Sequence, residues 1–219
     1  RMKALALLVF VAVLSPTASA VEVLSVPGLE RRRRLEHAEP VVDLAHSPDG
    51  RWLATWTARE FWLWPRGAER PAHRIPTAET IDARFTDDGG IVVASRNPSR
   101  IARWTVESGR RDDAWACELP EGQKPVVVSW LRATGELVVT TRKDFDHELM
   151  LFTAEGTLAW RRPVERYANW RATPDGRFLY NEWNLTRAEA MDARGAGRLV
   201  TGPLEECAQH GPGYSRVAP

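Results

Sequence analysis

The residues best suited to bind a metal ion lie in one acidic segment, KDFDHE, at positions 143–148. Asp144, Asp146 and Glu148 alternate there, so in an extended chain their carboxylates could face one hard cation such as calcium, with His147 between them. The segment lacks the glycine that would let a loop wrap around an ion. We therefore interpret it as a solvated loop between strands, and we expect no metal site and no cofactor.

Motifs for enzymatic catalysis are absent from the sequence. It contains no GxSxG, HExxH, P-loop or paired CxxC pattern, and its five histidines are scattered singly. The formal net charge of +1 gives no bulk basic excess that would indicate nucleic-acid binding. With 43% hydrophobic and 27% charged residues, the chain has the composition of a soluble globular protein. We expect a protein that is not an enzyme.

The first 20 residues have the pattern of a cleaved secretory signal. Lys3 supplies a positive charge, residues 4–14 form an uncharged apolar run, and Ala18-Ser19-Ala20 fits a small-x-small cleavage site. The apolar run is too short to span a bilayer comfortably. We therefore expect a secreted or periplasmic mature chain that begins near Val21 and has no membrane span. The alternatives are an uncleaved anchor and a buried strand.

Four similar turns organise the rest of the chain. They read SPDG, TDDG, RATG and TPDG and end at Gly50, Gly89, Gly135 and Gly176, so successive turns are 39, 46 and 41 residues apart. Short apolar runs of strand length flank each turn, and no window has a sustained helical period. A repeat of about 40–45 residues built of four short strands is typical of a β-propeller blade.

The sequence therefore predicts an all-β fold, a propeller of four-stranded antiparallel blades over residues 21–219. The blades are expected at about 40–76, 80–119, 125–164 and 167–208, with a partial blade at 21–36 and the start of another at 213–218. Trp115 and Cys117 are expected on the outer strand of the second blade. Partial blades at both ends indicate a fragment of a larger ring. Cys117 and Cys207 fall on blades that are not neighbours, so we expect no disulfide between them.

Several of these segments resemble the WD-repeat family of β-propellers. VVDLAHSPDGRWLAT is similar to the inner strand, turn and second strand of that family, and IARWTVESG and VEVLSVPG to its third strand and following turn. Glu36-His37 stands where the family often has Gly-His, which implies that His37 joins the family's structural hydrogen-bond network. The Trp-Asp dipeptide is absent, because Pro65 follows Trp64 and Thr105 follows Trp104.

The third predicted blade also resembles another group of proteins. LMLFTAEGTLAWRRPV, residues 149–164, is similar to the repeats of quinoprotein-like propellers, in which an acidic-Gly turn precedes a Trp strand. Some members of that group bind pyrroloquinoline quinone in the periplasm. This resemblance implies an alternative function, a quinoprotein-like periplasmic oxidoreductase or the propeller portion of a larger enzyme.

In the resembled WD-repeat fold, the loops between second and third strands share one rim of the ring. Here these loops are TARE, RNPSR, RKDFDH and WNLTR, and they carry basic and aromatic side chains. The candidate binding residues are Arg59, Arg96, Arg100, Arg142, Lys143, Trp183 and Arg187, with Phe145 beside them. A basic rim with aromatics suits an acidic protein, peptide or glycan. The alternative is an ordinary solvated rim, whose charge Glu60, Asp144 and Asp146 offset.

Three classes of function remain open on this sequence. We favour a secreted, monomeric, non-catalytic propeller that binds a protein or another ligand through its loop rim. The second class is the enzyme described above. The third is a structural or assembly role in the cell envelope, because the fold alone does not determine the function.

Overall fold

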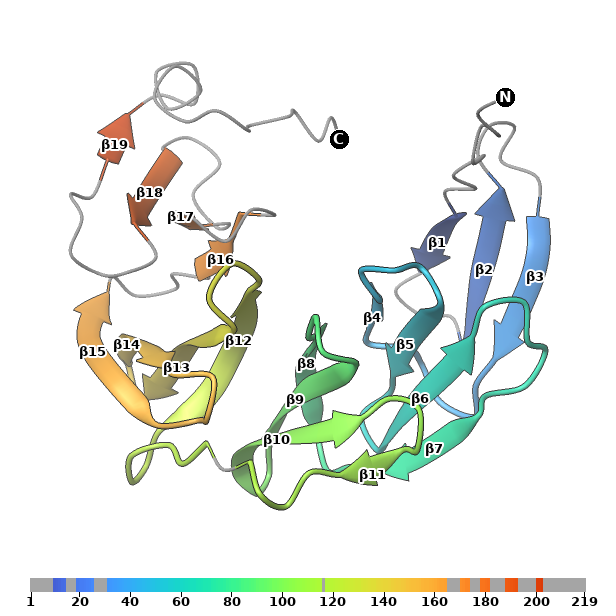
Figure 1. The fold of residues 1–219 in the computed structure, drawn as a ribbon, viewed down its shortest axis with the longest axis horizontal. Coiled ribbons are helices and arrows are strands. Elements are labelled where there is room, and N and C mark those ends of the chain that lie inside the picture. The colour runs from blue at the N-terminus through green and yellow to red at the C-terminus, as the bar shows by residue number, and fades with distance from the viewer. Residues whose placement is uncertain are drawn as a thin grey trace. The chain divides into compact units, whose positions relative to one another are not determined.

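The computed structural model describes residues 10–14, 19–25, 31–115, 117–164, 170–173, 178–181, 188–192 and 200–202. Every regular element in these residues is a β-strand, and all paired strands are antiparallel (Figure 1). The predicted all-β class with four-stranded antiparallel sheets is thus confirmed. The described part of the chain contains no helix long and apolar enough to cross a membrane. The chain divides into two compact units, Arg1–Thr80 and Ile81–Pro219.

The first unit contains one three-stranded and one four-stranded sheet, each with its strands in sequence order. The smaller sheet consists of β1 (Phe10–Leu14), β2 (Ala20–Ser25) and β3 (Arg31–Glu36). The larger consists of β4 (Asp43–His46), β5 (Trp52–Trp56), β6 (Glu60–Pro65) and β7 (His73–Pro76). Sequence order follows from short connections, because consecutive antiparallel strands need only a tight turn between them.

The β1 strand lies inside the segment that the sequence predicts to be a signal peptide. Phe10–Leu14 pairs with Val21–Ser25, so part of the apolar run forms a strand in this structure. This corresponds to the alternative of a strand in that segment. Cleavage after Ala20 would remove β1, and a secretory signal stays a prediction.

The second unit contains three four-stranded sheets, again with strands in sequence order. The first has β8 (Thr80–Phe85), β9 (Gly90–Arg96), β10 (Ser99–Thr105) and β11 (Arg110–Arg111). The second has β12 (Lys124–Leu131), β13 (Glu136–Lys143), β14 (Asp146–Phe152) and β15 (Leu158–Val164). The third has β16 (Trp170–Ala172), β17 (Phe178–Asn181), β18 (Ala188–Asp192) and β19 (Val200–Gly202).

The repeated turn between the first two strands of a sheet is fixed by side-chain hydrogen bonds. The Ser47 hydroxyl donates to the Asp49 carboxylate at 2.6 Å and accepts from Trp52 N at 2.8 Å. The TDDG turn uses Thr86 and Asp88 in the same way. Gly50 and Gly89 adopt φ angles of +66° and +83°, which is why glycine ends both turns.

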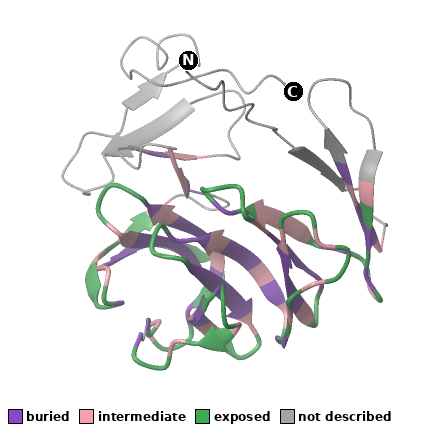
Figure 2. Ribbon diagram, turned by 45° about the vertical axis from the view of Figure 1, so that its right-hand side comes forward, coloured by how far each residue is buried: buried purple, intermediate pink, exposed green. Residues whose placement is uncertain are grey.

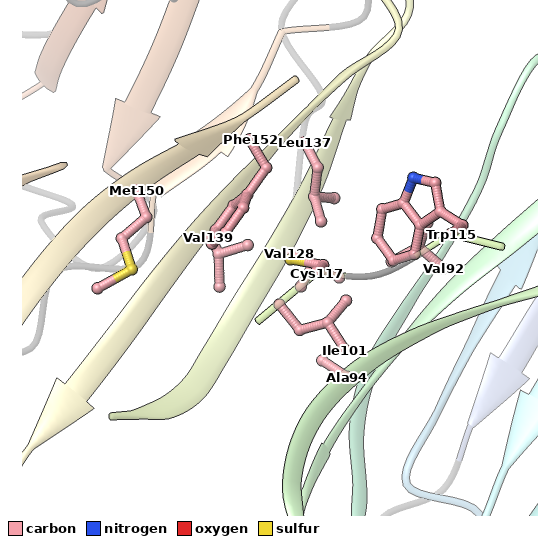
Figure 3. Close-up of a cluster of buried hydrophobic side chains, with 10 residues drawn as sticks. All are labelled: Val92, Ala94, Ile101, Trp115, Cys117, Val128, Leu137, Val139, Met150 and Phe152. Atoms are coloured by element: carbon pink, nitrogen blue, oxygen red, sulfur yellow. The ribbon is translucent and has the colours of Figure 1, made fainter. Parts of the chain in front are cut away.

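Apolar side chains fill the space between the sheets of the second unit. The middle strands β9 and β13 have almost no exposed residue except at their ends, because both of their faces are covered (Figure 2). Figure 3 shows one cluster between the β8–β11 and β12–β15 sheets, with side chains from both sheets pointing into it. A second cluster joins β13 and β14 to Trp170 and Leu179. Burial of this kind is the main stabilising contribution.

The outer strand of the β8–β11 sheet is shorter than predicted. Its β11 strand ends at Arg111, and Trp115 lies beyond it in the buried cluster, where its Nε1 donates to the Ala154 carbonyl at 2.9 Å. The Asp112 carboxylate accepts from Ala114 N at 3.2 Å, a local turn that ends strand pairing. Cys117 returns to the sheet as an isolated bridge to Ile101. Its thiol is free, and burial raises its pKa to about 12; Cys207 lies outside the described residues.

His37 joins a buried polar network in the first unit, as the family resemblance implied. Its Nε2 lies 3.3 Å from the Thr55 hydroxyl, which also accepts from Trp64 Nε1 at 2.8 Å. The imidazole also packs against the Trp62 and Trp64 rings. Desolvation lowers the pKa of His37 to about 4, so this imidazole is neutral at pH 7.

Candidate functional site

Two turns and one loop meet at one end of the sheets in the second unit. The turns are Asn97-Pro98, between β9 and β10, and Asp144-Phe145, between β13 and β14; the loop is 118–123, which precedes β12. The Ser99 hydroxyl donates to the Gln123 carbonyl at 2.7 Å, so the first turn contacts the loop. We refer to residues 96–100, 118–124 and 142–147 as the rim.

The second turn contacts the same loop through Lys143. Its Nζ donates to the Glu121 carbonyl at 3.4 Å, and a Cβ added to Gly122 would lie 3.0 Å from its Cε. The lysine stem therefore lies against the loop backbone, and glycine at 122 makes room for it. These contacts hold the three segments of the rim together.

A row of basic side chains crosses the β12–β15 sheet at this rim. Lys124 on β12 is the register partner of Arg142 on β13, which in turn is the partner of His147 on β14. Residues directly opposite in an antiparallel pair project to the same face, with Cβ atoms about 4.5–5.5 Å apart. Lys124 and Arg142 therefore lie side by side and exposed, whereas His147, next in the row, is buried.

The Lys124–Arg142 pair forms no ion pair within the described part of the chain. Neither side chain forms an ion pair or a hydrogen bond with another described residue, in contrast to Arg34, Arg84, Arg103 and Arg132, which are paired with carboxylates. Like charges directly opposite on a sheet destabilise it slightly. The arrangement is thus suited to an anionic group from outside, which would relieve the repulsion between the two cations.

An exposed aromatic ring lies on the turn at the end of the strand that carries Arg142. Phe145 occupies the tip of the β13–β14 turn and is 71% exposed, the largest exposure among the described large apolar side chains. Asp144, the other turn residue, has φ of +54°. One register step, Lys143 opposite Asp146, separates the turn from Arg142. Aromatic residues and arginine are enriched at the centre of protein-binding surfaces, so Phe145 and Arg142 are residue types suited to such a surface.

The other predicted basic residues of the second unit do not lie on the same sheet face as the Lys124–Arg142 pair. Lys143 is adjacent to Arg142 in the strand, so the two side chains point to opposite faces. Arg96 and Arg100 pair with Ser99 and Ser95, so they also lie on opposite faces of their sheet, and both are half-buried. The rim therefore presents its arginines on separate faces.

Arg59, Trp183 and Arg187 complete the predicted set of binding residues. Arg59 belongs to the first unit, where its exposed side chain forms an ion pair with Glu39 at 3.4 Å. Trp183 and Arg187 lie outside the described residues. The sequence-based set of binding residues does not include Lys124, because this residue begins a first strand and does not lie in a loop between second and third strands. Only the pairing register places it opposite Arg142.

The acidic segment 143–148 does not assemble a metal site in the structure. Asp146 and Glu148 project to one face of β14 and His147 to the other, which follows from the two-residue period of a strand. No group of three potential ligands comes together among the described residues. The residues present therefore do not form a cation cage.

Sequence comparisons give no relative for this chain. No protein-family profile matches it, and no curated protein matches its sequence.

Three solved structures resemble the chain. They are Kuenenia stuttgartiensis hydrazine synthase (TM-score 0.68, 14% identity, 88% of this chain), the Myceliophteria thermophila Cps50 (Swd1) β-propeller domain (0.69, 12%, 88%) and a mitotic checkpoint complex (0.66, 17%, 78%). The chain spans 65%, 67% and 57% of those chains, respectively. At such identities the likeness shows the fold alone. The fold of this chain is that of a β-propeller.

Proposed function

We propose that this chain is a secreted or periplasmic, non-catalytic scaffold that binds an acidic protein segment at the rim of its second unit. The observation that carries the proposal is the exposed Lys124–Arg142 pair, two adjacent cations that form no ion pair with another described residue. A protein partner is consistent with the Swd1 propeller domain and with the mitotic checkpoint complex, in which a propeller of this fold is part of a protein assembly.

The partner is best described as a short peptide segment with carboxylates next to an apolar side chain. Arg142 offers a planar fork that binds a carboxylate through two parallel hydrogen bonds, and Lys124 adds a second charge. Phe145 supplies exposed apolar area at the turn tip. Such a site is small and on a rigid sheet, so it needs little ordering when a partner binds.

The test is fluorescence anisotropy of a labelled Glu-rich peptide with the full chain. We expect saturable binding that weakens at least tenfold in the Lys124→Glu/Arg142→Glu variant, with a smaller dependence on salt. Arg110→Glu is the matched control, because Arg110 is an exposed strand cation at the opposite end of its sheet.

Two outcomes would overturn the proposal. Equal affinity of the wild type and the double variant would exclude the Lys124–Arg142 pair as the site. A sulfated glycan that displaces the peptide and binds more tightly, through the same two residues, would identify a glycan instead of a protein as the partner.

The enzymatic alternative stays a prediction. Its resemblance covers residues 149–164, which form the end of β14, the following turn and β15. Absorbance spectra of the purified chain with added pyrroloquinoline quinone would test it, because a bound quinone shifts its absorption on entering a protein site.

A further inference from the structure

The loop that leads into Lys124 is held by three hydrogen bonds. Residues 120–123 form a tight turn, which a bond from Gln123 N to the Pro120 carbonyl closes at 3.0 Å. Gly122 adopts a φ of +81° in this turn, a conformation that other residues rarely take. The other two bonds come from the side chains of Ser99 and Lys143. The loop is therefore fixed by its own backbone and from both sheets at the rim.

Ser99 begins β10 and fixes the residue directly before Lys124. Its hydroxyl donates to the Gln123 carbonyl at 2.7 Å, the usual length of a good O–H···O bond. Gln123 is 7% exposed, so the bond acts on a residue that is packed within the rim. Because this bond restrains the backbone at residue 123, it also restrains the point from which the next residue extends.

Strand pairing holds Lys124 less firmly than the rest of β12. Pro125 has no N–H to donate to the ladder, and the register shifts between Pro125 and Val127. The Lys124–Arg142 pair thus lies beyond an irregularity, at the end of a strand, where local opening costs least. The side-chain bonds to the loop therefore contribute more to the position of Lys124 than they would in a regular ladder.

We propose that Ser99 is a positioning residue for recognition at the rim, because it holds Lys124 opposite Arg142 through the Gln123 carbonyl. This inference rests on the proposed binding of an acidic segment at that pair. Lys143 supports the other side of the turn, where its Nζ donates to the Glu121 carbonyl at 3.4 Å. Without the Ser99 bond, Lys124 would sample more backbone positions, and a partner would have to order it at an entropic cost.

Fluorescence anisotropy of the full chain with the labelled Glu-rich peptide tests this role. We expect Ser99→Ala to weaken binding several-fold, whereas Ser99→Thr keeps the hydroxyl and should retain most of the affinity. Ser108→Ala is the matched control, because Ser108 lies in the turn after β10 and its hydroxyl also takes part in a hydrogen bond, from Arg110 N at 3.3 Å. It should bind as the wild type does. Near-ultraviolet circular dichroism confirms that each variant is native.

A double-mutant cycle separates positioning from a general effect on the fold. If Ser99 acts through Lys124, then Ser99→Ala should cause no further loss of affinity once Lys124→Gln has removed the charge. An equal loss in both backgrounds, or wild-type affinity of Ser99→Ala, would overturn the role of Ser99 and leave the rim pair as the binding site. Absence of peptide binding by the wild type would overturn the proposed function and this inference together.

Discussion

The second unit contains two pairs of neighbouring cations, and they differ in their surroundings. Arg84 and Arg171 share the buried carboxylate of Asp82, which also accepts two backbone N–H groups. Lys124 and Arg142 lie opposite each other on an exposed sheet end, without a described ion pair. The first pair belongs to a hydrogen-bonded cluster that connects three sheets, whereas the second pair is exposed to solvent at the rim.

This difference shows how the fold separates stability from recognition. A charge within the packed strands must be paired, because an unpaired buried charge costs several kcal/mol. A charge on the rim is solvated, so an unpaired cation there costs little and remains available to a partner. The same residue types therefore have different roles, and burial decides between them.

The largest effect is expected from removing the buried carboxylate. Asp82→Ala leaves two arginines and two backbone N–H groups without their acceptor, and we expect a loss of about 3–5 kcal/mol in the free energy of unfolding. Urea unfolding followed by tryptophan fluorescence measures it. Asp87→Ala, which removes a partly exposed partner of Arg132, is the control and should change stability by under about 1 kcal/mol. Equal losses in both variants would contradict the comparison.

A second effect follows from the neutral, buried imidazole of His37. Burial lowers its folded pKa to about 4, against 6.5 for the ordinary side chain. The unfolded chain therefore binds the proton first, and stability falls as pH decreases from about 6.5 to about 4, by about 3 kcal/mol in total. Urea unfolding across this pH range measures the loss, and His37→Gln should flatten the profile there. An unchanged profile in the variant would assign the pH dependence to other groups.

A smaller loss is expected from Thr140 on β13. Its hydroxyl accepts a hydrogen bond from the buried Trp170 N at 3.3 Å. The Asp82 carboxylate accepts from Val128 N in a similar way, so in both cases a side chain of one sheet pairs with a backbone N–H of the next sheet. Thr140→Val keeps the shape and removes the acceptor, so we expect a cost of about 1–2 kcal/mol. Chemical denaturation measures it, with the exposed Thr105→Val as control. No difference between the two variants would show that the hydrogen bond is dispensable.

The smallest effect on stability is expected at the rim. Arg142→Gln removes one of two opposed cations, and we expect a change within about 0.5 kcal/mol, on the stabilising side at low salt. Thermal unfolding at low and high salt measures it, because screening should reduce the difference between variant and wild type. A clear destabilisation would mean that Arg142 has a structural partner and would weaken its assignment to recognition.

The sequence predicts the fold much better than the site. Turns ending in glycine, flanked by apolar runs, are local signals, and the structure has strands where those runs lie, with Gly50 and Gly89 in the left-handed conformation. The outer strand near Trp115 was predicted too long: its pairing with β10 stops at Arg111 and returns only as the Cys117 bridge, because a local Asp112 turn and burial of the tryptophan outweigh strand propensity. The Lys124–Arg142 pair and the Asp82 cluster depend on register and on contacts between sheets. Neither is visible in a single sequence without pairing information.

Hydrogen exchange of the full chain with and without the Glu-rich peptide tests the central claim most directly. A peptide bound at the rim should slow exchange in the segments around 121–125 and 141–147 and leave the β8 and β16 strands unchanged. Protection that appears in the first strands instead of the rim, or protection that persists in the Lys124→Glu/Arg142→Glu variant, would contradict recognition by the Lys124–Arg142 pair.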